Sequence, residues 1–216
     1  MIGFPILFFL IIISALPVFL IFIWFRAGKY PLGPRWFLCA LLGGVISLFL
    51  AALLQSCFSR PGSIGWGSQI FKIFIQIALT EELSRLPVLF LLFQLRRRRD
   101  GNCDSPPSFW AATGLLSGLG FAVVETASYS AVNPGLALLR AFTAALLHGA
   151  CGARVGLTVI SLKTEPVRAL FRFLTAVILH GMYNFMILSP GLPAVFPVFI
   201  AFSAMASSLL IIRSRA

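Results

Sequence analysis

Residues 109–131 read FWAATGLLSGLGFAVVETASYSA, a stretch with no basic residue and a single carboxylate, Glu125. A helix needs about 20 predominantly apolar residues to cross the roughly 30 Å hydrocarbon core of a bilayer, and this stretch is long enough. Gly114 and Gly118 give it the small-xxx-small spacing that lets helices approach closely in a membrane. The stretch therefore predicts a closely packed membrane-spanning helix with one ionisable group inside it.

The composition of the whole chain points to the same class of protein. Hydrophobic residues make up 59% of the 216 residues and charged residues 11%, against roughly 45–50% and about 25% in ordinary globular proteins. The mean hydropathy is +0.99. These values argue against a soluble domain, a disordered chain and a nucleic-acid-binding protein, although the net charge is +11. We expect an all-α, polytopic membrane helix bundle that forms one integral-membrane domain over residues 1–216.

Long apolar runs predict about seven transmembrane helices. They lie at residues 4–25, 36–58, 69–95, 109–131, 137–162, 169–188 and 193–212. Basic residues gather in the first, third and fifth gaps between these runs and in the tail after the last one. The excess of Lys and Arg in cytoplasmic loops predicts that these gaps and the C-terminus are cytoplasmic and that the N-terminus lies outside.

Five ionisable side chains fall inside predicted spans. They are Glu81, Glu82, Glu125, His148 and His180. With the predicted orientation and a rise of 1.5 Å per residue, all five lie between the midplane and the outer third of the bilayer. An ionisable group at that depth is expected to face the bundle interior and to have a partner. Four helices therefore bring acidic and imidazole groups to a similar depth, which indicates one polar site.

The arginines near these ionisable residues can also have a purely structural role. Glu81 and Arg85 are i,i+4 and can form an ion pair on one face of the helix, while Glu82 points about 100° away. Such a pair can be purely architectural. We expect Arg140 to anchor the outer interface and Arg154 to extend its guanidinium toward the cytoplasmic surface.

Four segments carry the ionisable residues: LTEELSR at 79–85, GLGFAVVETASY at 118–129, RAFTAALLHGACG at 140–152 and LHGMYNF at 179–185. In order and spacing they resemble the EExxK/R motif, the GLGFAxxENxxY motif, the arginine–histidine helix and the LHGxYDF motif of the PrsW family of intramembrane proteases. That family is related to the CAAX-processing and bacteriocin-processing membrane proteases. The resemblance runs from about residue 65 to the end, and we place the motif-bearing core at about 65–190.

Three features depart from the family pattern. Thr126 stands where the family usually has Asn, and Asn184 stands where it often has Asp. Ser105–Phe109 replaces the acidic Asp-Gly segment that is common before the fourth span. The substitution at Thr126 can weaken a hydrogen bond in the site, and the altered loop bears on substrate access or regulation.

The resemblance implies an endopeptidase that hydrolyses a peptide bond of a membrane-protein or peptide substrate, in or next to the bilayer, with an activated water. The family's role is the first cleavage of an anti-sigma factor in stress signalling, which implies the bacterial plasma membrane. A carboxylate in a low-dielectric cavity can take and return a proton. The catalytic residues we expect are Glu81, Glu82, Glu125, His148 and His180.

Each of these residues has an expected role. Glu81 acts as general base, Glu82 holds the water or pairs with Arg85, and the two histidines orient the water or polarise the scissile carbonyl. Asn184 donates a hydrogen bond to the developing oxyanion, and Glu125 with Tyr129 completes the wall of the site. If His148, His180 and Glu125 converge within about 2–2.2 Å of one point, a catalytic zinc fits equally well. The chain has no HExxH motif, so the metal stays an open alternative.

Two other functions are compatible with buried Glu and His. A proton-coupled transporter would carry such residues, but it usually has inverted repeats and paired broken helices, which we do not find in the sequence. A catalytically inactive membrane scaffold would keep the fold without the reaction.

Overall fold

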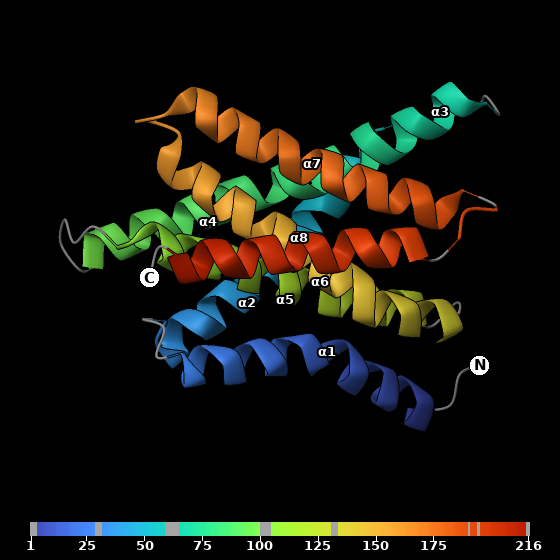
Figure 1. Ribbon diagram of the computed structural model, residues 1–216, viewed down its shortest axis with the longest axis horizontal. Helices are drawn as coiled ribbons and strands as arrows, with labels where there is room; N and C mark the ends of the chain where they lie inside the picture. The colour runs from blue at the N-terminus through green and yellow to red at the C-terminus, as the bar shows by residue number, and fades with distance from the viewer. Residues whose placement is uncertain are drawn as a thin grey trace.

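The computed structural model describes residues 4–28, 32–58, 65–99, 105–130, 134–189, 191–193 and 195–214. Within these ranges the regular structure is helical, which confirms the all-α fold class (Figure 1). The helices are α1 (Phe4–Ala27), α2 (Pro34–Ser56), α3 (Trp66–Phe71), η1 (Lys72–Leu79), α4 (Thr80–Arg99), α5 (Pro107–Ser130), α6 (Pro134–Ser161), α7 (Pro166–Leu188) and α8 (Val195–Ser214). Each predicted span corresponds to one of these helices, except that α3, η1 and α4 together replace 69–95.

Five helices of the described part of the chain are long and apolar enough to cross a membrane. They are α2, α5, α6, α7 and α8. The stretch from α3 to α4 is longer than a single span, and it carries two carboxylates and a run of four arginines, Arg96–Arg99. The count of seven spans stays a prediction for this stretch and for α1.

Helices α5 and α6 form the centre of the bundle. In each of them 83% of the membrane-length window is buried, against 28–39% in α2, α7 and α8. Helix α6 also contacts α7 and α8, and α5 also contacts α2 and α1. The two central helices are therefore surrounded by the other helices, and most of their side chains lie in the interior of the bundle.

Glycine allows the backbones of α5 and α6 to touch. A Cβ atom at Gly118 would lie 1.9 Å from the carbonyl oxygen of His148, and one at Gly114 would lie 2.1 Å from that of Gly152. These separations are far inside van der Waals contact, so a larger residue would push the helices apart. The close approach places Glu125 of α5 within reach of His148 of α6.

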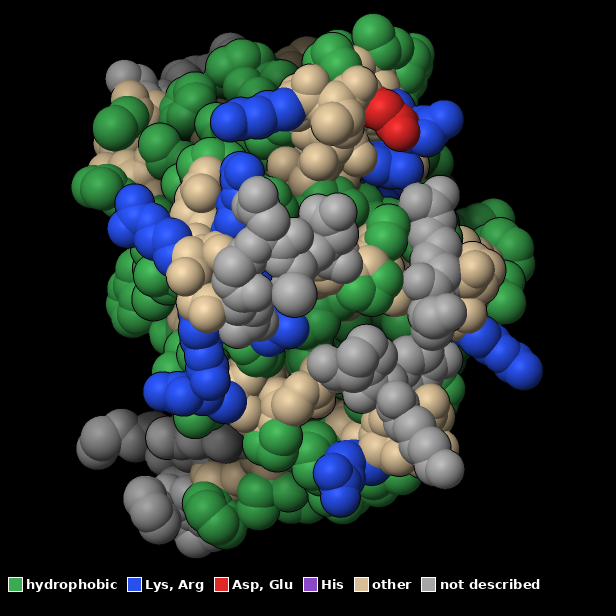
Figure 2. Space-filling view, turned by 90° about the vertical axis from the view of Figure 1, so that its left-hand side faces the viewer, with side chains coloured by type: hydrophobic (Ala, Val, Ile, Leu, Met, Phe, Trp, Pro, Cys, Tyr) green, Lys and Arg blue, Asp and Glu red, His purple; other side chains and the backbone are tan. Residues whose placement is uncertain are grey.

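Basic side chains gather at one end of the bundle. Figure 2 views that end and shows Lys and Arg side chains distributed over it, with acidic side chains scarce. The described basic residues there lie in the last turns of α1, α4 and α8, in the first turns of α2 and α7, and in the α6–α7 connection. They include Arg26, Arg35, Arg96–Arg99, Lys163, Arg168 and Arg213. The fold thus brings together the basic gaps that the sequence separates.

Replacing Gly118 by alanine is expected to lower the stability of the bundle. The new methyl group would meet the His148 backbone, and overpacking of this kind costs about 1–3 kcal/mol. The midpoint of thermal unfolding in detergent should fall by about 2–4 °C for each kcal/mol. Gly67→Ala is the control, because a Cβ atom there meets nothing within 4 Å. Equal midpoints for the two variants would contradict the tight α5–α6 contact.

Candidate active site

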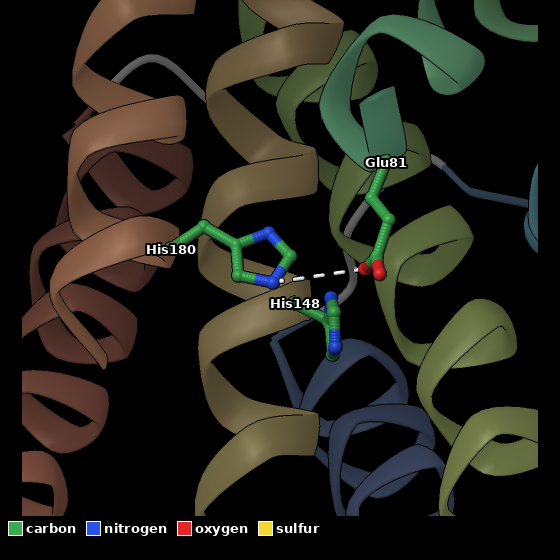
Figure 3. Close-up of side chains that lie close together, drawn as sticks. All are labelled: Glu81, His148 and His180. Atoms are coloured by element: carbon green, nitrogen blue, oxygen red, sulfur yellow. Dashed lines mark ion pairs between the residues drawn. The ribbon is translucent and has the colours of Figure 1, made fainter. Parts of the chain in front are cut away.

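The five ionisable side chains predicted inside spans lie together in the interior of the bundle. Glu81 and Glu82 come from α4, Glu125 from α5, His148 from α6 and His180 from α7. Glu82 has no exposed surface, while Glu125, the most accessible of the five, has 16% of its side chain exposed. Figure 3 shows Glu81, His148 and His180 pointing toward one another from three helices.

One chain of contacts joins these residues, and at least one basic group separates every two carboxylates along it. The contacts are Arg140–Glu125 (2.7 Å), Glu125–His148 (2.8 Å), His148–Arg85 (2.8 Å), Arg85–Glu82, Glu82–His180 (2.8 Å) and His180–Glu81 (3.6 Å). Opposite charges thus neutralise one another in a region where water cannot. The chain ties α4, α5, α6 and α7 together.

The hydrogen bonds define how His148 is protonated. Its Nδ1 atom lies 2.8 Å from Nη2 of Arg85, and a guanidinium can only donate, so Nδ1 accepts. The proton of the neutral ring is therefore on Nε2, which donates to Oε2 of Glu125 at 2.8 Å. Both nitrogens of His148 are engaged in this arrangement.

His180 is arranged differently and keeps one nitrogen available. Its Nδ1 atom donates a hydrogen bond of 2.8 Å to Oε1 of Glu82, the carboxylate that pairs with Arg85. The other nitrogen, Nε2, then faces Oε2 of Glu81 at 3.6 Å. A carboxylate behind a histidine is the usual support of an imidazole that presents its second nitrogen to a ligand.

Glu81 has one satisfied oxygen and one that lacks a hydrogen bond. Oε1 accepts a hydrogen bond of 3.2 Å from Nε2 of Gln55 in α2. Oε2 is buried and has no hydrogen-bond partner among the described residues. Because buried polar atoms are rarely left unsatisfied, the gap between Glu81 Oε2 and His180 Nε2 is suited to a proton, a water molecule or a cation.

The local sequence explains the position of Glu81. The residues directly before α4, Lys72–Leu79, form a π-helix, a wide helical form that is frequent at functional sites. Phe74 of this segment lies against α7 at Gly181, where a Cβ atom would be 2.3 Å from the Phe74 ring. The absence of a side chain next to His180 thus lets η1 approach α7 and brings Glu81 to the imidazole.

The structure decides between the two partners considered for Arg85 and corrects the expectation for Arg140. Arg85 forms its ion pair with Glu82 at i,i+3, which is one of the two roles expected for Glu82, and not with Glu81 at i,i+4. The carboxylate of Glu81 is directed toward Gln55 and His180 instead. Arg140 does not anchor the outer interface: it is buried, pairs with Glu125, and lies over the ring of Tyr129 at 4.2 Å from the centroid.

The predicted supporting residues Asn184 and Tyr129 lie on helices that also carry residues of the cluster, and so does Thr126. Asn184 is buried on α7 one turn beyond His180 and makes no hydrogen bond to any described residue. Tyr129 is 40% exposed, and its ring contacts the guanidinium of Arg140. The hydroxyl of Thr126 is buried without a hydrogen-bond partner in the described part of the chain, so it forms no hydrogen bond where the family usually has Asn.

Sequence reasoning missed Gln55, which reaches Glu81 and also Thr80 (3.3 Å) from α2. A signal was available, because Gln55 is a large polar residue at the end of an otherwise apolar helix. Its partner could not be identified without the packing of α2 against α4.

The donor set fits a divalent transition metal. Glu81, His148 and His180 each offer one ligand atom, and these atoms lie within 4.8 Å of one another. Two imidazoles and a carboxylate are ligands that zinc accepts, and the 3.6 Å between Glu81 Oε2 and His180 Nε2 is close to the roughly 3.4 Å between two ligands in a tetrahedral zinc site. The carboxylate of this donor set is therefore Glu81 and not Glu125, which we expected from the sequence. Glu125 contacts Arg140 and His148 instead. His148 can join only by giving up one of its two hydrogen bonds.

A comparison with protein-family models agrees with the four motifs. The model of the PrsW family intramembrane metalloproteases matches residues 33–210, which is most of the chain. Comparison with curated proteins and with solved structures gives no match.

Removing Arg140 is expected to destabilise the bundle strongly. Arg140→Met leaves the charge of Glu125 buried beside a neutral imidazole, and breaking a buried ion pair in this way costs about 3–5 kcal/mol. The double variant Arg140→Met/Glu125→Gln should recover most of that loss, because no charge is left unpaired. The free energy of unfolding in detergent is to be measured for both variants and for the wild type.

Arg168→Met is the matched control for this experiment. It breaks the ion pair with Glu165, whose two side chains are 61% and 45% exposed, and it should change the stability by less than about 1 kcal/mol. A loss for Arg140→Met no larger than that of the control would show that the Arg140–Glu125 pair contributes nothing to the fold.

Proposed function

Because the chain belongs to the PrsW family of intramembrane metalloproteases, we propose that its Glu81–His148–His180 cluster hydrolyses a peptide bond of a membrane-protein substrate. The family makes the protein a membrane-embedded protease; the reacting residues, the substrate and the chemistry of the water are our proposal. The single observation that carries it is the buried Oε2 atom of Glu81, which lacks a hydrogen bond and faces Nε2 of His180 across 3.6 Å.

The proposed reaction uses a water molecule in this gap. Glu81 takes a proton from the water as the oxygen attacks the scissile carbonyl, and it later returns the proton to the leaving amine. Gln55 holds the other oxygen of Glu81 at 3.2 Å, so the carboxylate keeps Oε2 directed at the water. His180 is held by Glu82 and orients the water from the opposite side.

Stabilisation of the developing oxyanion is assigned to Asn184. Its side chain is buried one turn beyond His180 and has no partner among the described residues, so its amide is available to a ligand. A preorganised donor in a water-poor site contributes more to the rate than the same donor in water. Arg85, Glu125, Arg140 and Tyr129 hold the cluster together around these groups.

A metal ion in this gap is the alternative to a free water, because it would use the same oxygen of Glu81. Glu81, His148 and His180 would hold it, and His148 would exchange a hydrogen bond for the ligand bond. A bound zinc ion would supply Lewis-acid polarisation of the carbonyl and a water that ionises near neutral pH. Glu82 would support His180 in that state as it does in the structure, through the hydrogen bond to Nδ1.

We further propose where the protein acts and on what. The basic end of the bundle favours a cytoplasmic C-terminus and an outside N-terminus in a bacterial plasma membrane. Residues 1–216 would form one protease domain with its core at about 65–190. The family role makes an anti-sigma factor, in its first cleavage during stress signalling, the substrate to test.

Replacing Glu81 by glutamine is expected to abolish proteolysis. Loss of the general base should lower the cleavage rate at least about 100-fold, measured on a co-expressed single-span substrate by the appearance of a new N-terminus. Glu165→Gln, a change at an exposed carboxylate outside the cluster, should cleave like the wild type. Unchanged cleavage in both Glu81→Gln and His148→Ala would refute the assignment. No cleavage by the wild type, with reduced abundance of the variants, would favour a scaffold.

The metal part of the proposal is tested by elemental analysis. We expect about one zinc per chain in the protein purified without chelator, and a clear loss of zinc in His180→Asn. A chelator should stop cleavage and added zinc should restore it. Full cleavage by metal-free protein would remove the metal from the mechanism and leave the water activated by Glu81 alone.

A further inference from the structure

A groove at the basic end of the bundle, about 220 Å³ in volume, lies between α6, α7 and α8. Three arginines line it, and no acidic residue of the described part of the chain does. These are Arg154 of α6 with Arg168 and Arg172 of α7, and we call the site the three-arginine groove. Its remaining walls are mainly apolar and include Leu157, Phe171 and Ile211.

Arg154 is the innermost of the three, and its hydrogen-bond partners among the described residues are all neutral. Its guanidinium donates to the carbonyl oxygen of Ala150 (2.9 Å) and to the hydroxyls of Ser207 (2.7 Å) and Ser208 (2.8 Å). It therefore extends toward α8 instead of along α6 to the end of the bundle, contrary to our expectation. No carboxylate of the described residues pairs with it, although it lies seven residues, or roughly 10 Å, before the end of α6.

The two arginines of α7 continue the line toward the end of the bundle. Arg168 and Arg172 are i,i+4 and share a face of the first two turns of α7. Arg172 donates to the hydroxyl of Ser161 at 2.5 Å, and this contact holds it against the end of α6. Arg168 is 61% exposed and pairs with Glu165. The three guanidinium groups thus run from the membrane interior to its surface.

The apolar walls indicate what completes the groove. Phe171 is 66% exposed on the outer surface of α7, next to the arginines. In a membrane, this surface faces lipid, and the only abundant anions at that depth are phosphate headgroups. Guanidinium groups bind phosphate oxygens in a planar, bidentate way, and basic pockets between transmembrane helices are suited to anionic headgroups.

We propose that the three-arginine groove binds one anionic phospholipid. The headgroup phosphate lies between Arg154 and Arg172, Arg168 contacts it from the surface, and an acyl chain lies along Phe171 and Ile211. The lipid supplies the negative charge that Arg154 does not receive from the protein. The groove is lined by none of the residues of the Glu81–His148–His180 cluster and does not require the proposed proteolysis.

The test is lipid titration of the purified full-length protein in mild detergent, followed by native mass spectrometry. Phosphatidylglycerol should bind more tightly than phosphatidylcholine with the same acyl chains. The variant Arg154→Gln/Arg172→Gln should bind phosphatidylglycerol about tenfold more weakly or worse. The control Arg26→Gln/Arg35→Gln removes two exposed charges from the same end, outside the groove, and should bind like the wild type.

Several results would overturn the proposal. They are equal affinity for the two lipids, equal loss in the two double variants, and unchanged binding after loss of Arg154 and Arg172. Should Arg154→Gln fail to fold, Arg168→Gln/Arg172→Gln replaces it, again with an expected loss of about tenfold. Inorganic phosphate at millimolar concentration should leave lipid binding unchanged; displacement of the lipid would mean that the groove takes free phosphate instead.

Discussion

The guanidinium of Arg85 has no exposed surface, and the arrangement of the site follows from the need to neutralise this charge. Glu82 forms the ion pair, His148 accepts a hydrogen bond, and the ring of Phe121 lies 4.4 Å from the guanidinium carbon. A buried charge that loses its partner is costly, so these contacts are not interchangeable. Through them, one side chain of α4 determines the tautomer of His148 and the position of Glu82.

The neighbouring carboxylates of the Glu81–Glu82 pair therefore have different environments. Glu82 is held between Arg85 and His180, whereas Glu81 is held at one oxygen only. Adjacent helix positions differ by about 100°, so one carboxylate can serve the structure while the other faces the gap. The same sequence motif thus supplies both a fixed counter-ion and an available base.

Much of this arrangement could be predicted from the sequence because membrane burial leaves few polar residues. Apolar runs predicted the helices, and the scarcity of acids and histidines singled out Glu81, Glu125, His148 and His180, which the structure brings together. The partners could not be predicted in the same way. Arg140 could face either lipid or Glu125, and Gln55 could face away from Glu81. The outcome depends on how α2, α5 and α6 are rotated against their neighbours. The glycine contacts that fix these rotations cannot be identified from the sequence alone.

The π-helix before α4 has a consequence for how this site tolerates change in chain length. Such a segment contains a residue more than an α-helix of the same number of turns. If one residue between Lys72 and Leu79 were deleted, this segment could become α-helical. The position of α4 would then change little. Deleting one residue after Thr80 would instead rotate the rest of α4 by about 100° relative to the carboxylates. Insertions and deletions among relatives should therefore concentrate before the Glu81–Glu82 pair and be rare in α4 itself.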